Sequence, residues 1–551
     1  MVGSPDLPMN WKSYEELLLD PTLTARKVRE IVSRSGHCEE GRDPLPGTAA
    51  VLAIRHGHGA LFQVDFVQGQ PAETGMTEKA SRAGQTALNV VRRELGGLRP
   101  ELLAEPWSVQ VRCLLDPGVR ADKRPLPLDG ASLGLPAALA AVSRLLDLPP
   151  PPDLVATAEV LPDGRLQSVA GLLKKLDLLR AWTPRVQTLI VAQDQPDTAP
   201  DPARRPRIVP ARDLSEAIAI AWPQLDTQGL ADHILDRLSP PDRPLLARQL
   251  FSLLMRGGPR VLGWRVVRQL AEGLADSLEG DARWEALTAA AIAARHSGDN
   301  DLPLPANIPA TLPASLRLEV LAHRLQHAAD RADPDWEDLT SQALACADAH
   351  GLLDPSARLY GAAGRLLASW GELDRAEALL ERACAAWEAL YHEEECARPL
   401  CEWLRLRGAR GDLDGVRQLT AGPAHRALNH PATDPASRSW LRVAIGRALV
   451  QAGAPREALP WLDEQPGESP DARAVRLRFR LGLVPSQDDS DLHAMDALPE
   501  PLRTMTRSLR RLDLGDEGGL ADLPEVELSR LRAWQAPDTR AASHVARWWR
   551  Y

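Results

Sequence analysis

The sequence has few cysteines, few aromatic residues and no long apolar run. Its six cysteines are scattered over 551 residues without a Cys-x-x-Cys pair, which argues against a zinc knuckle and against a disulfide framework. Residues 1–20 lack the basic segment followed by an apolar one that a secretory signal needs. No uncharged apolar run reaches the length of about 18 residues that a membrane span requires. We therefore expect a cytoplasmic protein without a membrane partner.

Basic charge and nucleotide-binding or metal-binding motifs are also scarce. The formal net charge is −10 and the sequence pI is near 5.8, so nucleic acid is not expected as a main partner. The Gly-x-x-x-x-Gly-Lys-Ser/Thr loop that binds ATP phosphates is missing. His56 and His58 are separated by glycine, which favours a hairpin turn over a metal site. The segment His-Glu-Glu-Glu-Cys at residues 392–396 is interpreted as a charged helix face and not as a metal site. We expect no cofactor and no metal.

Lysine is rare, and its position in the sequence suggests a chemical role. Only six of the 65 basic residues are lysine, and none follows Lys175. In a helix over residues 171–182, Leu172, Leu176 and Leu179 form one stripe, and Lys175 lies on it. Desolvation lowers the pKa of a lysine, which can then act as a general base. The alternative is a lysine that extends from the edge of a core into solvent.

Ser132 begins a second apolar pattern. The segment Asp129-Gly130-Ala131-Ser132-Leu133-Gly134 precedes residues 135–146, in which apolar side chains recur at helical spacing. A hydroxyl at a helix start lies near unpaired N–H groups and the positive end of the helix dipole, both of which stabilise an oxyanion. The alternative is an ordinary N-cap serine.

Strand and helix patterns alternate between residues 48 and 222, which predicts one α+β or α/β domain. Two short helical patterns within residues 11–36 precede it. We expect strands over residues 49–55, 61–67, 107–115, 186–192 and 208–209, a hairpin of 154–160 with 165–169, and helices over 77–94, 135–146, 171–182 and 214–222.

The remaining residues, from about 226 to 551, show only helical patterns. Gly371, Gly411 and Gly453 are the second residues of three similar segments, 370–383, 410–419 and 452–462. They lie 40 and 42 residues apart, a period typical of stacked helix pairs. These segments resemble irregular tetratricopeptide repeats. We expect residues 542–551 to form a terminal helix that packs against the rest of the chain. Six tryptophans are interpreted as core residues, with an aromatic ligand groove as the alternative: Trp336, Trp370, Trp387, Trp403, Trp440 and Trp461.

Three short motifs in residues 48–222 resemble the proteolytic domain of the Lon family of Ser–Lys peptidases. Its Lys-Asp-Gly-Pro-Ser-Ala-Gly, Thr-Gly-Glu and Gly-Gly-Leu-Lys-Glu-Lys motifs read here as residues 128–134, 157–159 and 170–175, without a gap. The resemblance implies that Ser132 is the nucleophile, that Lys175 is the base and that Thr157 orients the lysine amine. It also implies supporting roles for Asp129, Gly130, Ala131 and Glu159, with the amides of residues 130–133 holding the oxyanion.

Some positions differ from the family motifs. Ala131, Ala158 and Ala170 replace a proline and two glycines, and the His-x-His of many members has no match in residues 109–112. In other proteins the same fold, without the catalytic Ser–Lys pair (the dyad), occurs as a non-peptidase domain beside ATPases. The alternative function is therefore a catalytically inactive Lon-like and tetratricopeptide-like scaffold for protein–protein assembly.

Together these patterns predict three parts and one leading function. Residues 1–45 form a short helical extension, 46–225 an α+β Lon-protease-like domain, and 226–551 an all-α tetratricopeptide-like solenoid. We expect an ATP-independent serine endopeptidase that cleaves a protein or peptide, while the helical half binds a protein partner and controls cleavage. This pairing resembles effectors of bacterial defence systems. An ATPase acting from another chain is a third alternative, and the oligomeric state stays open.

Overall fold

A computed structural model provides the structure of the chain. It describes residues 45–55, 58–69, 76–115, 128, 130–182, 186–195, 206–297, 304–331, 335–351, 354–464, 468, 470–481, 483, 488–498, 503–504 and 506–508. The helices expected within residues 11–36 and 542–551, and the expected site residue Asp129, lie outside these described residues.

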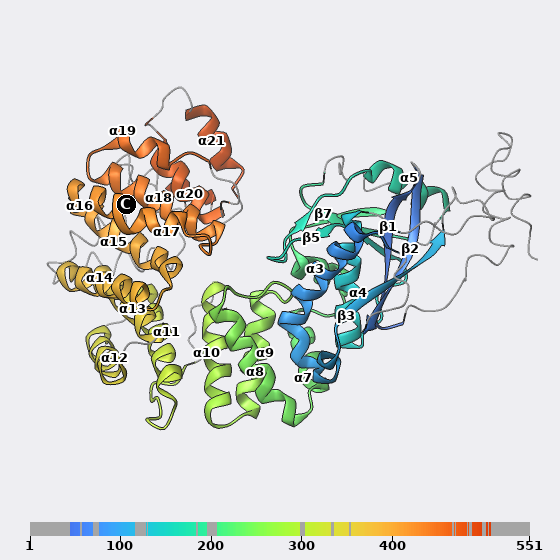
Figure 1. Ribbon diagram of the computed structural model, residues 1–551, viewed down its shortest axis with the longest axis horizontal. Coiled ribbons are helices and arrows are strands. Elements are labelled where there is room, and N and C mark those ends of the chain that lie inside the picture. Colours follow the sequence, from blue (N-terminus) through green and yellow to red (C-terminus); the bar gives the residue numbers. More distant parts are fainter. Residues whose placement is uncertain are drawn as a thin grey trace, which may run out of the picture. The chain divides into compact units, whose positions relative to one another are not determined.

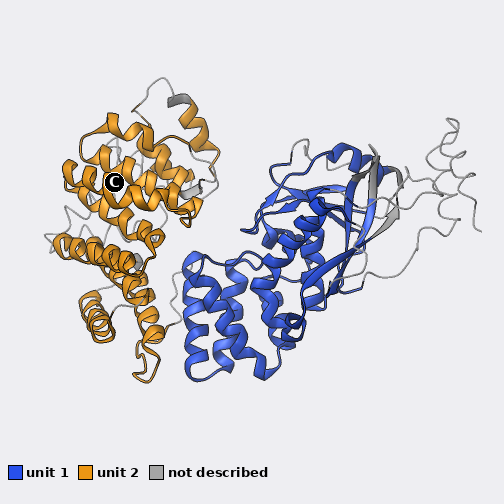
Figure 2. Cartoon of the chain, in the orientation of Figure 1, with its two compact units in different colours: residues 1–303 blue, residues 304–551 orange. Residues whose placement is uncertain are grey.

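The chain divides into two compact units, Met1–Pro303 and Leu304–Tyr551 (Figure 2). The first contains an α/β region with a mixed sheet, and the second is mostly helical among its described residues. The strand patterns end before residue 226, where the helical half was expected to begin. The compact units nevertheless separate at Pro303, because four helices after residue 226 belong with the sheet.

The six-stranded sheet has the order β3-β2-β1-β4-β7-β8. Figure 1 labels four of its strands, β1, β2, β3 and β7. β1 pairs antiparallel with β2, and β2 with β3, whereas β1, β4, β7 and β8 run parallel. Arg55 pairs with His58 in the β1–β2 hairpin, as the glycine-spaced histidines predicted. The strand bounds are β1 Thr48–Arg55, β2 His58–Gln68, β3 Trp107–Leu115, β4 Leu154–Thr157, β7 Thr188–Ala192 and β8 Arg207–Ala211.

The hairpin expected from residues 154–160 and 165–169 is only partly correct. The first half of this stretch is β4, which is buried along its whole length and lies between β1 and β7. Only β5 (Glu159–Val160) and β6 (Leu166–Gln167) form a hairpin, closed by a turn in which Gly164 has a φ of +83°. A strand buried on both faces is typical of parallel pairing in a central position.

Helices cover both faces of the sheet. Leu52 of β1 packs with the leucine stripe of α5 (Leu172–Trp182), and the neighbouring residues of β1 face the opposite side. On that side lie α3 (Glu78–Leu95) and α4 (Gly134–Leu146), which contact each other. Thr77 caps α3 by accepting a hydrogen bond from the Ala80 amide. Asp213 similarly caps α6 (Leu214–Ala221).

Four further helices complete the first unit, and a buried carboxylate connects them to α3. Glu94 is 1% exposed and accepts hydrogen bonds from the amides of Arg260, Val261 and Leu262 at 2.6, 2.9 and 2.6 Å. Burial raises the pKa of Glu94 to about 7, while the three amides oppose this rise. We call this contact the Glu94 clasp. The helices are α7 (Thr227–Arg237), α8 (Arg243–Met255), α9 (Trp264–Ser277) and α10 (Gly280–His296).

The second unit contains successive helices with three equivalent turns. Gly371, Gly411 and Gly453 have φ values of +82°, +71° and +88°, and each follows the first helix of a pair. In each turn, the residue after the glycine donates its backbone N–H to the carbonyl of the residue five positions before itself. The helices are α11 Ala314–Arg331, α12 Trp336–His350, α13 Asp354–Ser369, α14 Leu373–Ala389, α15 Ala397–Ala409, α16 Leu413–Leu419, α17 His425–Asn429, α18 Pro435–Gln451, α19 Pro455–Ala458, α20 Pro470–Arg480 and α21 Asp488–Asp496.

Five of the six tryptophans that were expected in the core of this unit contribute to it. Trp336 and Trp387 are buried, and Trp370, Trp403 and Trp461 pack against the same cluster. The prediction that Trp440 is a core residue is wrong, because this side chain is 37% exposed. Both of its neighbours on α18 are buried, so the residue between them points outward. None of the described helices of either unit has the length and apolarity that a membrane span requires.

Candidate active site

Ser132 lies in a short helical turn where the chain passes close to β5. The turn, η3 (Ala131–Leu133), leads directly into α4. Gly130 precedes it with a φ of +97°, a conformation that favours glycine. A Cβ on Gly134 would lie 2.7 Å from the Val160 amide nitrogen, so only glycine permits this approach. These two glycines hold a serine that is 7% exposed at the start of a long helix.

Lys175 brings a buried amine to this serine. It lies on α5 within the apolar stripe, is 0% exposed, and contrasts with Lys174, which is exposed. Its Nζ lies 2.9 Å from Ser132 Oγ and 2.7 Å from Thr157 Oγ1. The structure therefore brings together three side chains that are 25 and 18 residues apart along the sequence.

Thr157 fixes the orientation of the lysine amine. It is the last residue of β4 and is fully buried. Its hydroxyl donates to the Leu52 carbonyl of β1 at 3.2 Å, which leaves an oxygen lone pair directed at Lys175 Nζ. When the amine is neutral, it can donate one N–H to Thr157 and accept the proton of Ser132 Oγ with its lone pair. This arrangement suits removal of the serine proton.

Burial gives Lys175 the protonation state that a base requires. Desolvation lowers the pKa of Lys175 from its ordinary value of 10.5 to about 7. No charged group among the described residues contributes to this shift. About half of the amines are therefore neutral at pH 7, and the conjugate acid is still able to return a proton at the same pH.

The other expected site residues have less direct positions. Gly130 and Ala131 form the turn before Ser132, as described above, and Asp129 lies outside the described residues. Glu159 is half-buried in β5, where its backbone pairs with Gln167. Among the described contacts, its carboxylate reaches neither Ser132 nor Lys175. The expected supporting role of Glu159 therefore has no contact that explains it.

No family model matches the chain. A search among curated proteins also finds no similar sequence. The functional interpretation of the dyad thus depends on its geometry and on the motifs in residues 128–175.

Sequence reasoning missed two groups near the candidate site. One is the Leu52 carbonyl, which accepts the Thr157 proton. The other is Gln195, whose buried side chain bonds to the backbone of Val169 just before α5. A backbone carbonyl leaves no signal in a sequence. A glutamine in a loop rich in aspartate and proline resembles any solvated polar residue.

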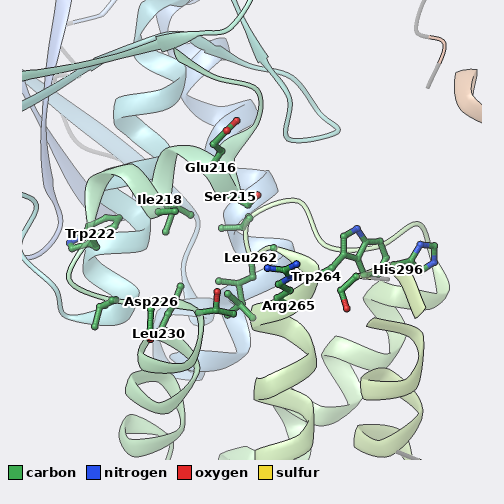
Figure 3. Close-up of a pocket in the computed structure, with 17 residues that line it drawn as sticks. Ser215, Glu216, Ile218, Trp222, Asp226, Leu230, Leu262, Trp264, Arg265 and His296 are labelled. Carbon is green, nitrogen blue, oxygen red and sulfur yellow. The ribbon is translucent and has the colours of Figure 1, made fainter. Parts of the chain in front are cut away.

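A cavity in the first unit lies apart from the dyad. Its volume is about 390 Å³, and its walls come from α6, α7, the loop before α9 and the end of α10 (Figure 3). Trp222 and Trp264 contribute to an apolar lining, and Trp264 stacks on His296 with ring centroids 4.1 Å apart. Neither Ser132 nor Lys175 lines this cavity. Among the described residues, no cluster of three His, Cys, Asp or Glu side chains could hold a metal ion.

Proposed function

We propose that this protein is a serine peptidase in which Ser132 is the nucleophile and Lys175 is the general base. The observation that carries the proposal is the buried Lys175 Nζ, 2.9 Å from Ser132 Oγ and 2.7 Å from Thr157 Oγ1. The motif resemblance to Lon-family peptidases supports the same assignment. The chain carries no ATP-binding loop of the Gly-x-x-x-x-Gly-Lys-Ser/Thr type, and we propose that cleavage needs no ATP.

Energetics favour a chemical role for Lys175 over a structural one. A pKa lowered from 10.5 to about 7 means that the folded state disfavours the protonated amine by about 5 kcal/mol, at about 1.4 kcal/mol per pKa unit. Methionine or leucine would fill the same apolar stripe without this cost. A lysine whose described hydrogen-bond partners are two hydroxyl groups gains little stability in return, but it gains the ability to accept the Ser132 proton.

The proposed reaction is acyl transfer. Neutral Lys175 takes the proton from Ser132 Oγ, and the oxygen attacks the peptide carbonyl carbon. The amides at the start of η3 stabilise the resulting oxyanion, because the first N–H groups of a helical turn have no partner within the turn. Lys175 then gives its proton to the leaving amine, and an acyl-enzyme forms. Water, activated by the neutral Lys175, hydrolyses the ester and regenerates Ser132.

An activity-based probe tests this proposal without knowledge of the substrate. We expect a fluorophosphonate to form a covalent adduct on Ser132 of the full chain, detected by intact mass and peptide mapping. Ser132→Ala should abolish the adduct, and Lys175→Met should slow its formation by at least 100-fold. Lys174→Met is the matched control, because Lys174 is exposed on the same helix, and it should label like wild type.

The rate of labelling should rise with pH through an inflection near 7, where Lys175 loses its proton. Labelling that is absent at every pH, or that survives in Ser132→Ala, would contradict the peptidase proposal. Unlabelled protein that still forms a stable complex with a partner would instead support the inactive scaffold.

We also propose that the second unit binds a protein partner and controls access of the substrate to the dyad, as in bacterial defence effectors. Stacked helix pairs present an extended surface suited to protein recognition. The three glycine turns of this unit support a repeated architecture of the tetratricopeptide type. Ser132→Ala provides the test, because it should retain a substrate that wild type cleaves. A co-purifying partner whose addition or removal leaves cleavage by wild type unchanged would count against control of cleavage.

A further inference from the structure

Gln195 is a buried polar residue to which the proposed mechanism gives no role. It follows β7 in a short turn, and its side chain is 4% exposed. Its carboxamide makes two hydrogen bonds with the backbone of one residue. The Val169 amide donates to Oε1 at 2.9 Å, and Nε2 donates to the Val169 carbonyl at 3.0 Å. Both bonds are buried, so their loss leaves desolvated polar groups without these partners.

The position of Val169 links this contact to the dyad. Val169 lies beyond the end of β6 and two residues before Gly171, which has a φ of +75°. The Gly171 carbonyl accepts a hydrogen bond from the Lys175 amide at 3.3 Å. The chain from Val169 to Lys175 is therefore short and has a defined path. At the start of this segment, the Gln195 carboxamide pairs with the N–H and C=O of Val169, as the backbone of a neighbouring strand would.

We propose that Gln195 is a positioning residue that fixes the start of α5 and thereby holds Lys175 Nζ against Ser132. This inference rests on the proposed dyad. The leucine stripe holds α5 on the sheet, but apolar contacts resist separation better than they resist sliding along the helix axis. Directional hydrogen bonds at the start of the helix supply that missing restraint. A carboxamide suits the task because its donor and acceptor match one backbone N–H and one C=O.

The test compares Gln195→Met with wild type in the full chain, using the rate of fluorophosphonate labelling between pH 5.5 and 9.5. A loosened start of α5 lets water reach the amine, so we expect the inflection of the pH–rate profile to move above 7. A shift of one unit lowers the neutral fraction at pH 7 from about one half to about one eleventh, which is roughly a fivefold loss of rate. Gln193→Met is the matched control, because Gln193 is exposed in the same turn, and its profile should equal that of wild type.

Gln195→Glu keeps the shape of the side chain and serves as the second variant if Gln195→Met fails to fold. Its protonated carboxyl can make both bonds to Val169, whereas its ionised form lacks the donor. Its deficit relative to wild type should therefore grow as pH rises through the pKa of the new carboxyl. Melting temperatures of the same variants distinguish a positioning effect on the labelling rate from a loss of stability.

Wild-type rates and an unmoved inflection in the folded variants would overturn the inference. A rate that falls only in proportion to the folded fraction, with the inflection still near 7, would also overturn it. In both cases the dyad itself would stand, because wild type would still label on Ser132. A wild type that is never labelled would overturn both the dyad and the role of Gln195.

Discussion

Replacing Lys175 with methionine should change the stability of the first unit in a pH-dependent way. Burial lowers the pKa of Lys175 from 10.5 to about 7 in the folded state. Between these two values the unfolded chain binds a proton that the folded chain does not bind. The free energy of unfolding of wild type therefore rises with pH across this window, and at or below pH 7 the buried charge costs the most.

The magnitude follows from the same two pKa values. Protonation linkage gives a gain of about 2 kcal/mol in the unfolding free energy between pH 7 and pH 9, out of roughly 5 kcal/mol over the whole window. Methionine has no proton to bind, so the variant lacks this contribution. We expect the stability difference between Lys175→Met and wild type to shift by about 2 kcal/mol towards wild type as pH rises from 7 to 9.

Urea denaturation at pH 6, 7, 8 and 9 measures this difference. Subtracting the variant from wild type removes the contributions of other titrating groups, including thiols such as that of Cys401, whose pKa desolvation raises. The change should be confined to the unfolding transition of the first unit, and Lys174→Met should show none. A difference that stays constant between pH 7 and 9 would refute the claim that folding desolvates the Lys175 amine.

Further variants test individual contacts. Thr157→Val should lower the labelling rate by about 10-fold to 100-fold, because the lysine loses one hydrogen bond of about 1.5–3 kcal/mol, and kinetics with the probe measure this. The pKa of Glu94 is raised to about 7, so the unfolding free energy of wild type should fall by up to about 3 kcal/mol as pH rises from 4.5 to 7. Glu94→Gln should remove this slope in urea titrations. Gly134→Ala should lower both the melting temperature and the labelling rate, since its Cβ would meet Val160. Gly411→Ala should destabilise only the second unit, by about 1 kcal/mol, with labelling unchanged.

Periodicity in the sequence predicted the elements that carry the candidate site. The leucine stripe of α5 predicted that Lys175 would share a buried face, and the structure agrees. The proximity of Lys175 to Ser132 and Thr157 was expected only through the motif resemblance, because spacing along the chain does not give distances between elements. The split of residues 154–160 into β4 and β5 was missed, since an apolar run does not reveal where a strand leaves its sheet.

Long-range polar contacts were beyond sequence reasoning for a different reason. Glu94 has the sequence environment of any charged residue near a helix end, yet it bonds to amides more than 160 residues away. The same holds for Gln195, 26 residues from Val169. Trp440 shows the opposite error, because its residue type alone led to an exposed side chain being assigned to the core.

The Glu94 clasp also bears on the smallest fragment of this protein that can fold. α3 bears Glu94 near its C-terminal end, and a Cβ on its Gly84 would lie 3.2 Å from Leu133, next to Ser132. Ending the chain at residue 225 would remove all three amide donors and with them the hydrogen bonds that hold the C-terminal end of α3. We expect an autonomous catalytic fragment to end after α10 rather than after α6, so gene fusions that exchange the helical partner would keep residues up to about 300.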